Sequence, residues 1–246
     1  MYRGVVGRLA AKLGWARRLG RRARNDESGV AFMEFALTLP FLTMSFLGGV
    51  ELVNLTVKHQ QMSRIATTTA DLAARFRSSI DETDVETLFL GARLALKDAE
   101  FDERGRVILS AITAFQPDGD GNSNGHQIRW QRCDGDYDIV STIGGEGWGV
   151  DEEGEPTGEI PLVHGMEVLW PNTVMFAEVT YVYEPIFGAG GFLSDISEVF
   201  EEREISYRAA FIARELSLQT ITNTTNIPEP DLSTCPQPIR GELGEG

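Results

Sequence analysis

The chain has 246 residues, of which 42% are hydrophobic and 24% charged, a composition that excludes a disordered chain and a polytopic membrane protein. The net charge of −15 argues against a nucleic-acid binder, and two cysteines exclude a zinc site of four thiolates. Residues 1–28 carry eight basic and two acidic side chains, whereas the other 218 residues carry 14 basic and 35 acidic ones. A basic head on an acidic body indicates that the two parts occupy different surroundings.

The most apolar stretch of the chain, residues 30–57, follows the basic residues 1–29 directly. As a helix, its first 26 residues would extend roughly 39 Å, enough to cross a hydrocarbon core of about 30 Å. A buried helix of a soluble protein would have a clearer polar face, and a cleaved secretory signal would have a shorter apolar region. We therefore predict one transmembrane helix, with residues 1–29 in the cytoplasm and residues 58–246 in the periplasm of a bacterium.

Two carboxylates interrupt this predicted span, and each needs an explanation because a charge in hydrocarbon is costly. Glu51 stands near the outer end, where we expect it to reach headgroups or water. Glu34 is the fifth residue after Gly29, at the junction between the basic leader and the apolar helix. A glycine lets the chain extend into a protease cleft, and the Glu34 carboxylate would neutralise an amine released at Val30. The plainer interpretation is a turn glycine followed by an acid that the helix dipole favours.

This junction resembles the cleavage site of type IV prepilins and pseudopilins, which a prepilin peptidase cuts after the glycine. The wider stretch, residues 24–76, has a glycine-ending basic leader and then a series of residues in an apolar helix, and the residues that matter are Gly29, Glu34, Phe35, Ala36, Leu37, Pro40, Gly48, Glu51 and Leu52. In these residues the chain resembles the TadE-like family, the minor pseudopilins of the tight-adherence (Flp) pilus system. Phe35 departs from the tyrosine that often follows the glutamate in pseudopilins of this system.

The resemblance implies cleavage between Gly29 and Val30 and a function in pilus assembly without catalysis. The implied partners are the prepilin peptidase, other minor pseudopilins, the major pilin, the inner-membrane assembly platform and membrane lipid, with no nucleic acid. The implied location is the bacterial inner membrane, with three alternatives open for the mature protein: it enters the pilus fibre, sits at its tip or stays in the membrane.

Beyond the span, the pattern predicts a helical extension over residues 58–98, an α+β domain over residues 99–219 and an extended tail over residues 220–246. A helical stripe comprises Leu55, Met62, Ile65, Thr69, Leu72 and Phe76, and a cap at Asp81 and Asp84 begins a second helix that ends near residue 98. Strand patterns occur at residues 107–115, 127–133, 173–185 and 205–213. The predicted fold is α+β, with a long N-terminal transmembrane helix extending into a periplasmic domain with an antiparallel β-sheet.

Two features of the outer part indicate additional bonds. In an oxidising periplasm Cys133 and Cys235 are expected to pair and attach the tail to the sheet, the alternative being two free thiols. The loop at residues 117–125 matches the opening of a calcium site, although Gln131 stands where such a loop has its bidentate glutamate, so a polar hairpin loop is the competing interpretation. The candidate calcium ligands are Asp118, Asp120, Asn122 and Asn124.

The sequence shows no nucleophile elbow, phosphate loop or dinucleotide fingerprint, so we predict neither enzymatic activity nor an organic cofactor. The leading hypothesis is a pseudopilin that is processed after Gly29 and packs through its N-terminal helix. The alternative is an uncleaved single-pass protein whose periplasmic domain binds a ligand, with calcium at the 118–125 loop. A third hypothesis, an anchored periplasmic enzyme, needs a catalytic pocket that the sequence does not indicate.

Overall fold

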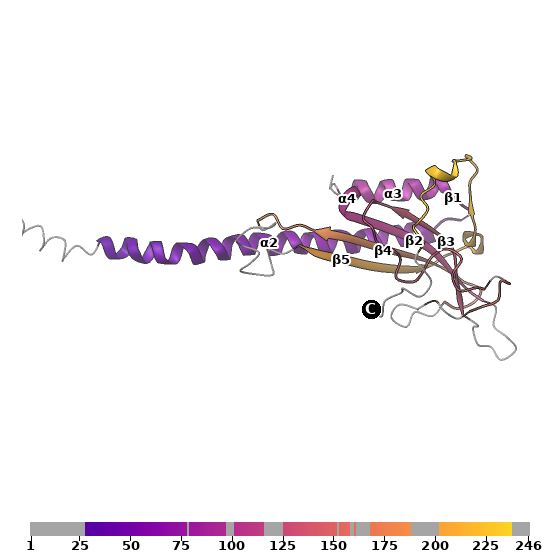
Figure 1. Ribbon diagram of the computed structural model, residues 1–246, viewed down its shortest axis with the longest axis horizontal. Coiled ribbons are helices and arrows are strands. Elements are labelled where there is room, and N and C mark those ends of the chain that lie inside the picture. The colour runs from indigo at the N-terminus through magenta and orange to yellow at the C-terminus, as the bar shows by residue number, and fades with distance from the viewer. Residues whose placement is uncertain are drawn as a thin grey trace, which may run out of the picture. The chain divides into compact units, whose positions relative to one another are not determined.

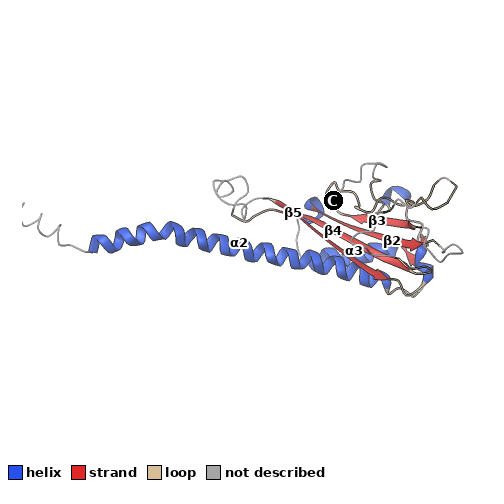
Figure 2. Cartoon of the chain, turned by 90° about the horizontal axis from the view of Figure 1, so that it is seen from below, coloured by secondary structure: helices blue, strands red, loops and turns tan. Residues whose placement is uncertain are grey.

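A computed structural model of the chain describes residues 28–77, 79–96, 101–115, 125–151, 153–157, 160, 168–187 and 202–237. The chain forms two compact units, Met1–Val50 and Glu51–Gly246. Figure 1 labels the helices and strands, and Figure 2 distinguishes them by colour.

The described part of the first unit is the N-terminal half of helix α2 (Ser28–Ala74). Every side chain from residue 29 to residue 43 is exposed, although most of them are apolar. Within the described residues, α2 is the one helix long and apolar enough to cross a membrane, with a mean hydropathy of 1.7 over an 18-residue window, none of which is buried. The helix meets the requirement for a single span, and insertion into a membrane stays a prediction.

The second unit is built on a four-stranded antiparallel sheet in the order β3-β2-β4-β5 (Figure 2). The central strands β2 and β4 are buried along nearly their whole length because both faces of the sheet are covered there, whereas the edge strand β5 alternates in burial. The strand bounds are Gly105–Ala114 for β2, His126–Asp134 for β3, Thr173–Tyr183 for β4 and Arg203–Ile212 for β5.

The main hydrophobic core lies between one face of this sheet and two helices, the second half of α2 and helix α3 (Glu82–Leu96). A short helix, α4 (Phe101–Arg104), leads directly into β2. Alternate residues of β2 and β4 point to the opposite face, where a smaller core forms against the loop that connects β3 with β4. The helices contribute Met62, Ile65, Ala66, Ala70, Ala73, Val85 and Phe89 to the main core, and the sheet contributes Val107, Leu109, Ala111, Met175, Ala177 and Val179.

The C-terminal segment returns across the domain. It forms the 3₁₀ helix η3 (Leu216–Gln219), the short strand β6 (Ile221–Thr222) and the 3₁₀ helix η4 (Glu229–Asp231). Strand β6 pairs in parallel with β1 (Ile80–Asp81), which directly precedes α3. The described part of the predicted extended tail is therefore fastened to the domain by backbone pairing, an attachment that the sequence pattern did not indicate beyond the expected disulfide.

The predicted α+β class is confirmed: a long apolar N-terminal helix and an antiparallel sheet are both present. One member of the predicted helical stripe is wrong, because Leu72 is half exposed while Ala66, Ala70 and Ala73 are buried. At about 100° per residue, Leu72 lies roughly 100° from the direction that Met62 and Ala73 share. The small alanines face the core because they allow the helix and the sheet to approach closely.

Candidate functional site

The predicted processing residues lie on the first turns of α2. Gly29, Val30, Glu34 and Phe35 are all exposed on the helix surface. A Cβ atom built at Gly29 would meet no atom within 4 Å, so the fold described here has room for a side chain at this position. Within the described residues, this glycine therefore has no steric requirement.

Two threonine hydroxyls in this apolar segment are satisfied by the helix itself. The hydroxyl of Thr38 donates to the carbonyl of Phe35 at 3.1 Å, and the hydroxyl of Thr43 donates to the carbonyl of Pro40 at 3.0 Å. Pro40 lies inside the helix, where it has no N–H to donate. Internal bonding of this kind is what a helix needs in hydrocarbon, where water offers no partner.

Glu51 is not at a solvated edge, and the expectation that it reaches headgroups or water is wrong. Its side chain is fully buried in the second unit. The hydroxyl of Tyr183 donates to this carboxylate, and so do the backbone N–H groups of Ile186, at 3.1 Å, and Phe187, at 3.3 Å. The amide of Asn54 donates to the same Tyr183 hydroxyl at 2.8 Å. This carboxylate therefore attaches the start of the β4–β5 connection to α2.

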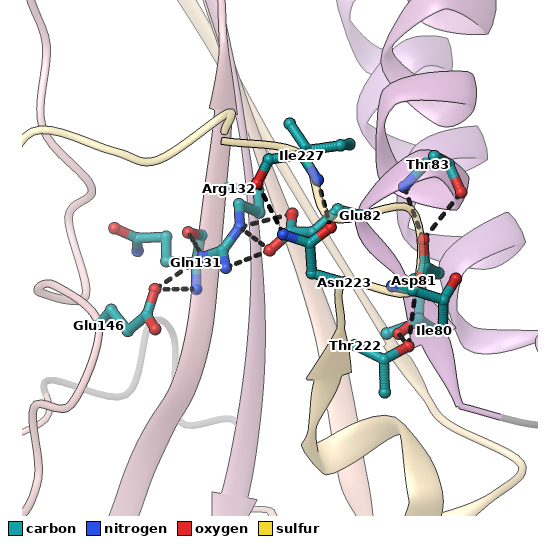
Figure 3. A network of polar contacts seen from close by, with 11 residues as sticks. Ile80, Asp81, Glu82, Thr83, Gln131, Arg132, Glu146, Thr222, Asn223 and Ile227 are labelled. Atoms are coloured by element: carbon teal, nitrogen blue, oxygen red, sulfur yellow. Dashed lines mark hydrogen bonds and ion pairs between the residues drawn. The ribbon is translucent and has the colours of Figure 1, made fainter. Parts of the chain in front are cut away.

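A second buried charge cluster connects β3 with the start of α3 (Figure 3). The guanidinium of Arg132 donates to Glu82 from Nε, at 2.9 and 3.1 Å, and from Nη2, at 2.6 Å. Its Nη1 donates to Glu146 at 2.8 Å. The side chains of Arg132 and Glu82 are only 6% and 5% exposed. Burial lowers the pKa of Arg132, but the hydrogen bond with Glu82 and the charges of both glutamates outweigh it and raise the pKa overall.

Asp81 joins the cap of α3 to the C-terminal segment (Figure 3). One of its carboxylate oxygens accepts the backbone N–H of Thr83 at 3.2 Å, which caps the helix, and the other accepts the backbone N–H of Thr224 at 2.8 Å. The carboxylate of Asp84 in turn accepts the N–H of Asp81, completing a reciprocal cap. The hydrogen bond from Thr224 and those from Thr83 hold the pKa of Asp81 well below its usual range, against the opposing effect of burial.

We expect this carboxylate to make the unfolding of the domain acid-sensitive. The pKa of Asp81 is lower in the folded chain than in the unfolded chain, where it is about 4. The carboxylate therefore stabilises the fold fully above pH values of about 4, and this stabilisation is lost as the pH falls through the pKa of the folded state. Urea unfolding at several pH values between about 5 and 2 should show a shallower pH dependence for Asp81→Asn than for the wild type. Parallel pH dependences for the two proteins would contradict this assignment.

The predicted pairing of the two cysteines is present, as a disulfide between Cys133 on β3 and Cys235 in the C-terminal segment. Beside it, the backbones of Arg132 and Thr234 form an isolated antiparallel β-bridge. The candidate calcium ligands Asp118, Asp120, Asn122 and Asn124 fall outside the described residues. Within the described residues, no group of three or more histidine, cysteine, aspartate or glutamate side chains is arranged to hold a metal ion.

Comparisons of the chain with protein-family models, with curated proteins and with solved structures gave no match. The functional assignment therefore depends on the residues of this chain and on the geometry described above.

Proposed function

We propose that this chain is a TadE-like minor pseudopilin that acts in assembly of a bacterial Flp, or tight-adherence, type IV pilus. It is inserted into the inner membrane through residues 30–57 with its N-terminus in the cytoplasm. A prepilin peptidase cuts it between Gly29 and Val30. The mature chain then packs through its apolar helix against other minor pseudopilins or the major pilin, and no chemistry occurs on the protein itself.

The observation that carries this proposal is the junction at the start of α2. A basic leader ends at a glycine that the fold does not require, and a helix with exposed apolar side chains follows it. Glu34 stands five residues after that glycine, so its carboxylate is placed to pair with the amine of Val30, either its own or that of a neighbouring subunit. An apolar helix exposed on all sides needs lipid or other helices to cover it. In a pseudopilin, lipid covers the helix in the membrane and the helices of neighbouring subunits cover it after assembly.

The second unit supports the proposal in a different way. The second half of α2 packs onto the antiparallel sheet and belongs to the folded domain, whereas the exposed apolar residues lie in the first half. The sequence suggested that both Glu34 and Glu51 are intramembrane carboxylates. Glu51 instead accepts hydrogen bonds from Tyr183 and Ile186 and so attaches the end of β4 to the helix. Glu34 is then the one carboxylate of residues 30–50, and we assign the pairing with an amine to it alone.

Surface piliation tests this function. In a strain that lacks this chain, we expect the wild-type gene to restore pili and Gly29→Val to fail, because a branched side chain blocks the peptidase cleft. Gly91→Val is the matched control, since Gly91 is also a helical glycine with no atom within 4 Å of a built Cβ. Restoration of pili by Gly29→Val, at a wild-type level, would contradict the proposal.

A further inference from the structure

The end of the second unit at which α2 enters it carries several exposed apolar side chains. Ile186 and Phe187, just after β4, are 60% and 36% exposed. On the neighbouring turns of α2, Leu52, Val53 and Val57 are exposed as well. We call these five residues the apolar end of the domain. None of them is charged, and large apolar side chains exposed at one level of a domain, on both sides of the helix, indicate a surface that meets something other than water.

The backbone and polar groups at this end are already paired within the protein. Glu51 accepts the N–H groups of Ile186 and Phe187, so the exposed turn leaves neither donor without a partner. On α2, the amide of Asn54 donates to Tyr183, and the hydroxyl of Thr56 donates to the carbonyl of Leu52 at 2.7 Å. Each polar side chain between Glu51 and Val57 therefore has an internal partner, which is what a low-dielectric surrounding requires.

The hydrogen bonds to Glu51 also fix the level of the exposed turn along the helix. The N–H groups of Ile186 and Phe187 lie beside the first residue of the second unit, which follows Val50 directly in the chain. The exposed face of α2 stays uncharged through Val57, six residues and about 9 Å further from the N-terminus, and its one polar side chain, Thr56, is bonded to the helix itself. Lys58 is the first charged residue after this face, with its ammonium group 5.2 Å from the ring centre of Tyr181. The turn with Ile186 and Phe187 lies beside Glu51, which is nearer to the N-terminus than Val57. If α2 is in contact with lipid as far as Val57, this turn is therefore at the depth of the lipid as well.

We propose that the apolar end of the domain is seated in the outer interfacial region of the lipid bilayer, with Ile186 and Phe187 inserted beside the helix. This inference rests on the membrane span in the proposed function. A lipid surface is favoured over a second protein because the apolar end continues an uncharged helix face that already begins at Phe35 and is interrupted only by the enclosed Glu51. The domain is then held at the membrane at two points, by α2 and by the turn with Ile186 and Phe187. Two points of contact limit the tilt of the domain before the subunit is extracted.

Depth-dependent fluorescence quenching tests the insertion on the full-length chain. Phe187→Trp is reconstituted into phosphatidylcholine–phosphatidylglycerol vesicles that contain phospholipids brominated along their acyl chains. Ile212→Trp is the matched control, because Ile212 is also exposed but pairs with Val174 at the opposite end of the sheet, while Arg203 pairs with Tyr183. Arg203 and Ile212 are nine positions apart along β5, which separates the two ends of the strand by about 30 Å. Fluorescence of the wild-type chain is subtracted in each case.

We expect brominated lipid to reduce the added fluorescence of Phe187→Trp and to leave that of Ile212→Trp unchanged. Equal quenching of the two variants, or none in either, overturns the proposal while the chain stays in the vesicles. A chain that does not remain with the vesicles during flotation overturns the membrane span and this inference together. The near-ultraviolet circular dichroism of both variants, to which the buried Trp130 contributes, verifies that the domain keeps its native packing.

Discussion

Replacing Arg132 by methionine is expected to lower the free energy of unfolding by about 3–5 kcal/mol, because it leaves the buried Glu82 carboxylate without its partner. Three hydrogen bonds to Glu82 disappear at once, and the methionine refills much of the volume of the arginine stem. The measurement is urea unfolding of the full chain in detergent micelles, followed by tryptophan fluorescence.

A double variant separates the cost of an unpaired charge from a general loss of packing. Arg132→Met combined with Glu82→Gln removes both charges, and we expect it to be more stable than Arg132→Met alone. The effects of the two single substitutions should therefore add to more than the effect of the pair. Strict additivity would mean that the two side chains do not interact, in conflict with their distances.

Removing the disulfide is the second change with a large expected effect. Cys133 and Cys235 are separated by 102 residues, so the bond closes a long loop in the unfolded chain. In the chain-entropy model such a loop corresponds to about 4–5 kcal/mol, and we expect the Cys133→Ala, Cys235→Ala double variant to lose several kcal/mol of the free energy of unfolding. The loss is measured by urea unfolding under the conditions used for Arg132→Met.

Reduction of the native chain provides the control for this substitution. A thiol reductant should destabilise the wild type by a similar amount and leave the alanine variant unaffected, because only the first has a bond to break. The C-terminal segment should loosen first, since apart from the disulfide it is held by short contacts such as the two-residue pairing of β6 with β1, the pairing of Arg132 with Thr234 and the hydrogen bonds to Asp81. A wild-type chain whose unfolding midpoint does not respond to full reduction would rule out a stabilising role for the bond.

Much of the architecture is predictable because local patterns coincide with the observed elements. The four strand patterns each fall within two residues of β2, β3, β4 and β5, since alternating or continuous apolar runs matched strands that are covered on one or both faces. The cap at Asp81 and Asp84 lies at the start of α3, where its carboxylates bond the first turn as the spacing predicts. The prediction of the cysteine pairing followed from having only two cysteines and from the expected oxidising location.

Apart from the disulfide, the contacts between distant segments could not be predicted from the sequence pattern. Arg132 and Glu82 are 50 residues apart, and Glu51 and Tyr183 are 132 apart, so no local period connects them. Glu51 was misplaced because a carboxylate at the end of an apolar run usually reaches water, and only the fold supplies Tyr183 and the turn after β4 as alternative partners. The one local signal was the presence of Asn54 three residues after Glu51. Two polar side chains one turn apart on an apolar helix indicate that this face meets a polar partner. The strands β1 and β6, of two residues each, were too short for any periodicity.

The intact mass of the protein in membranes tests the central claim most directly, measured in cells with and without the prepilin peptidase. We predict the mass of residues 30–246 in the first case and that of the full chain in the second. Residues 1–29 should be the only part that is lost, because the peptidase acts after Gly29. A full-length mass in both cells would contradict processing and would leave a permanently anchored protein with an outer domain.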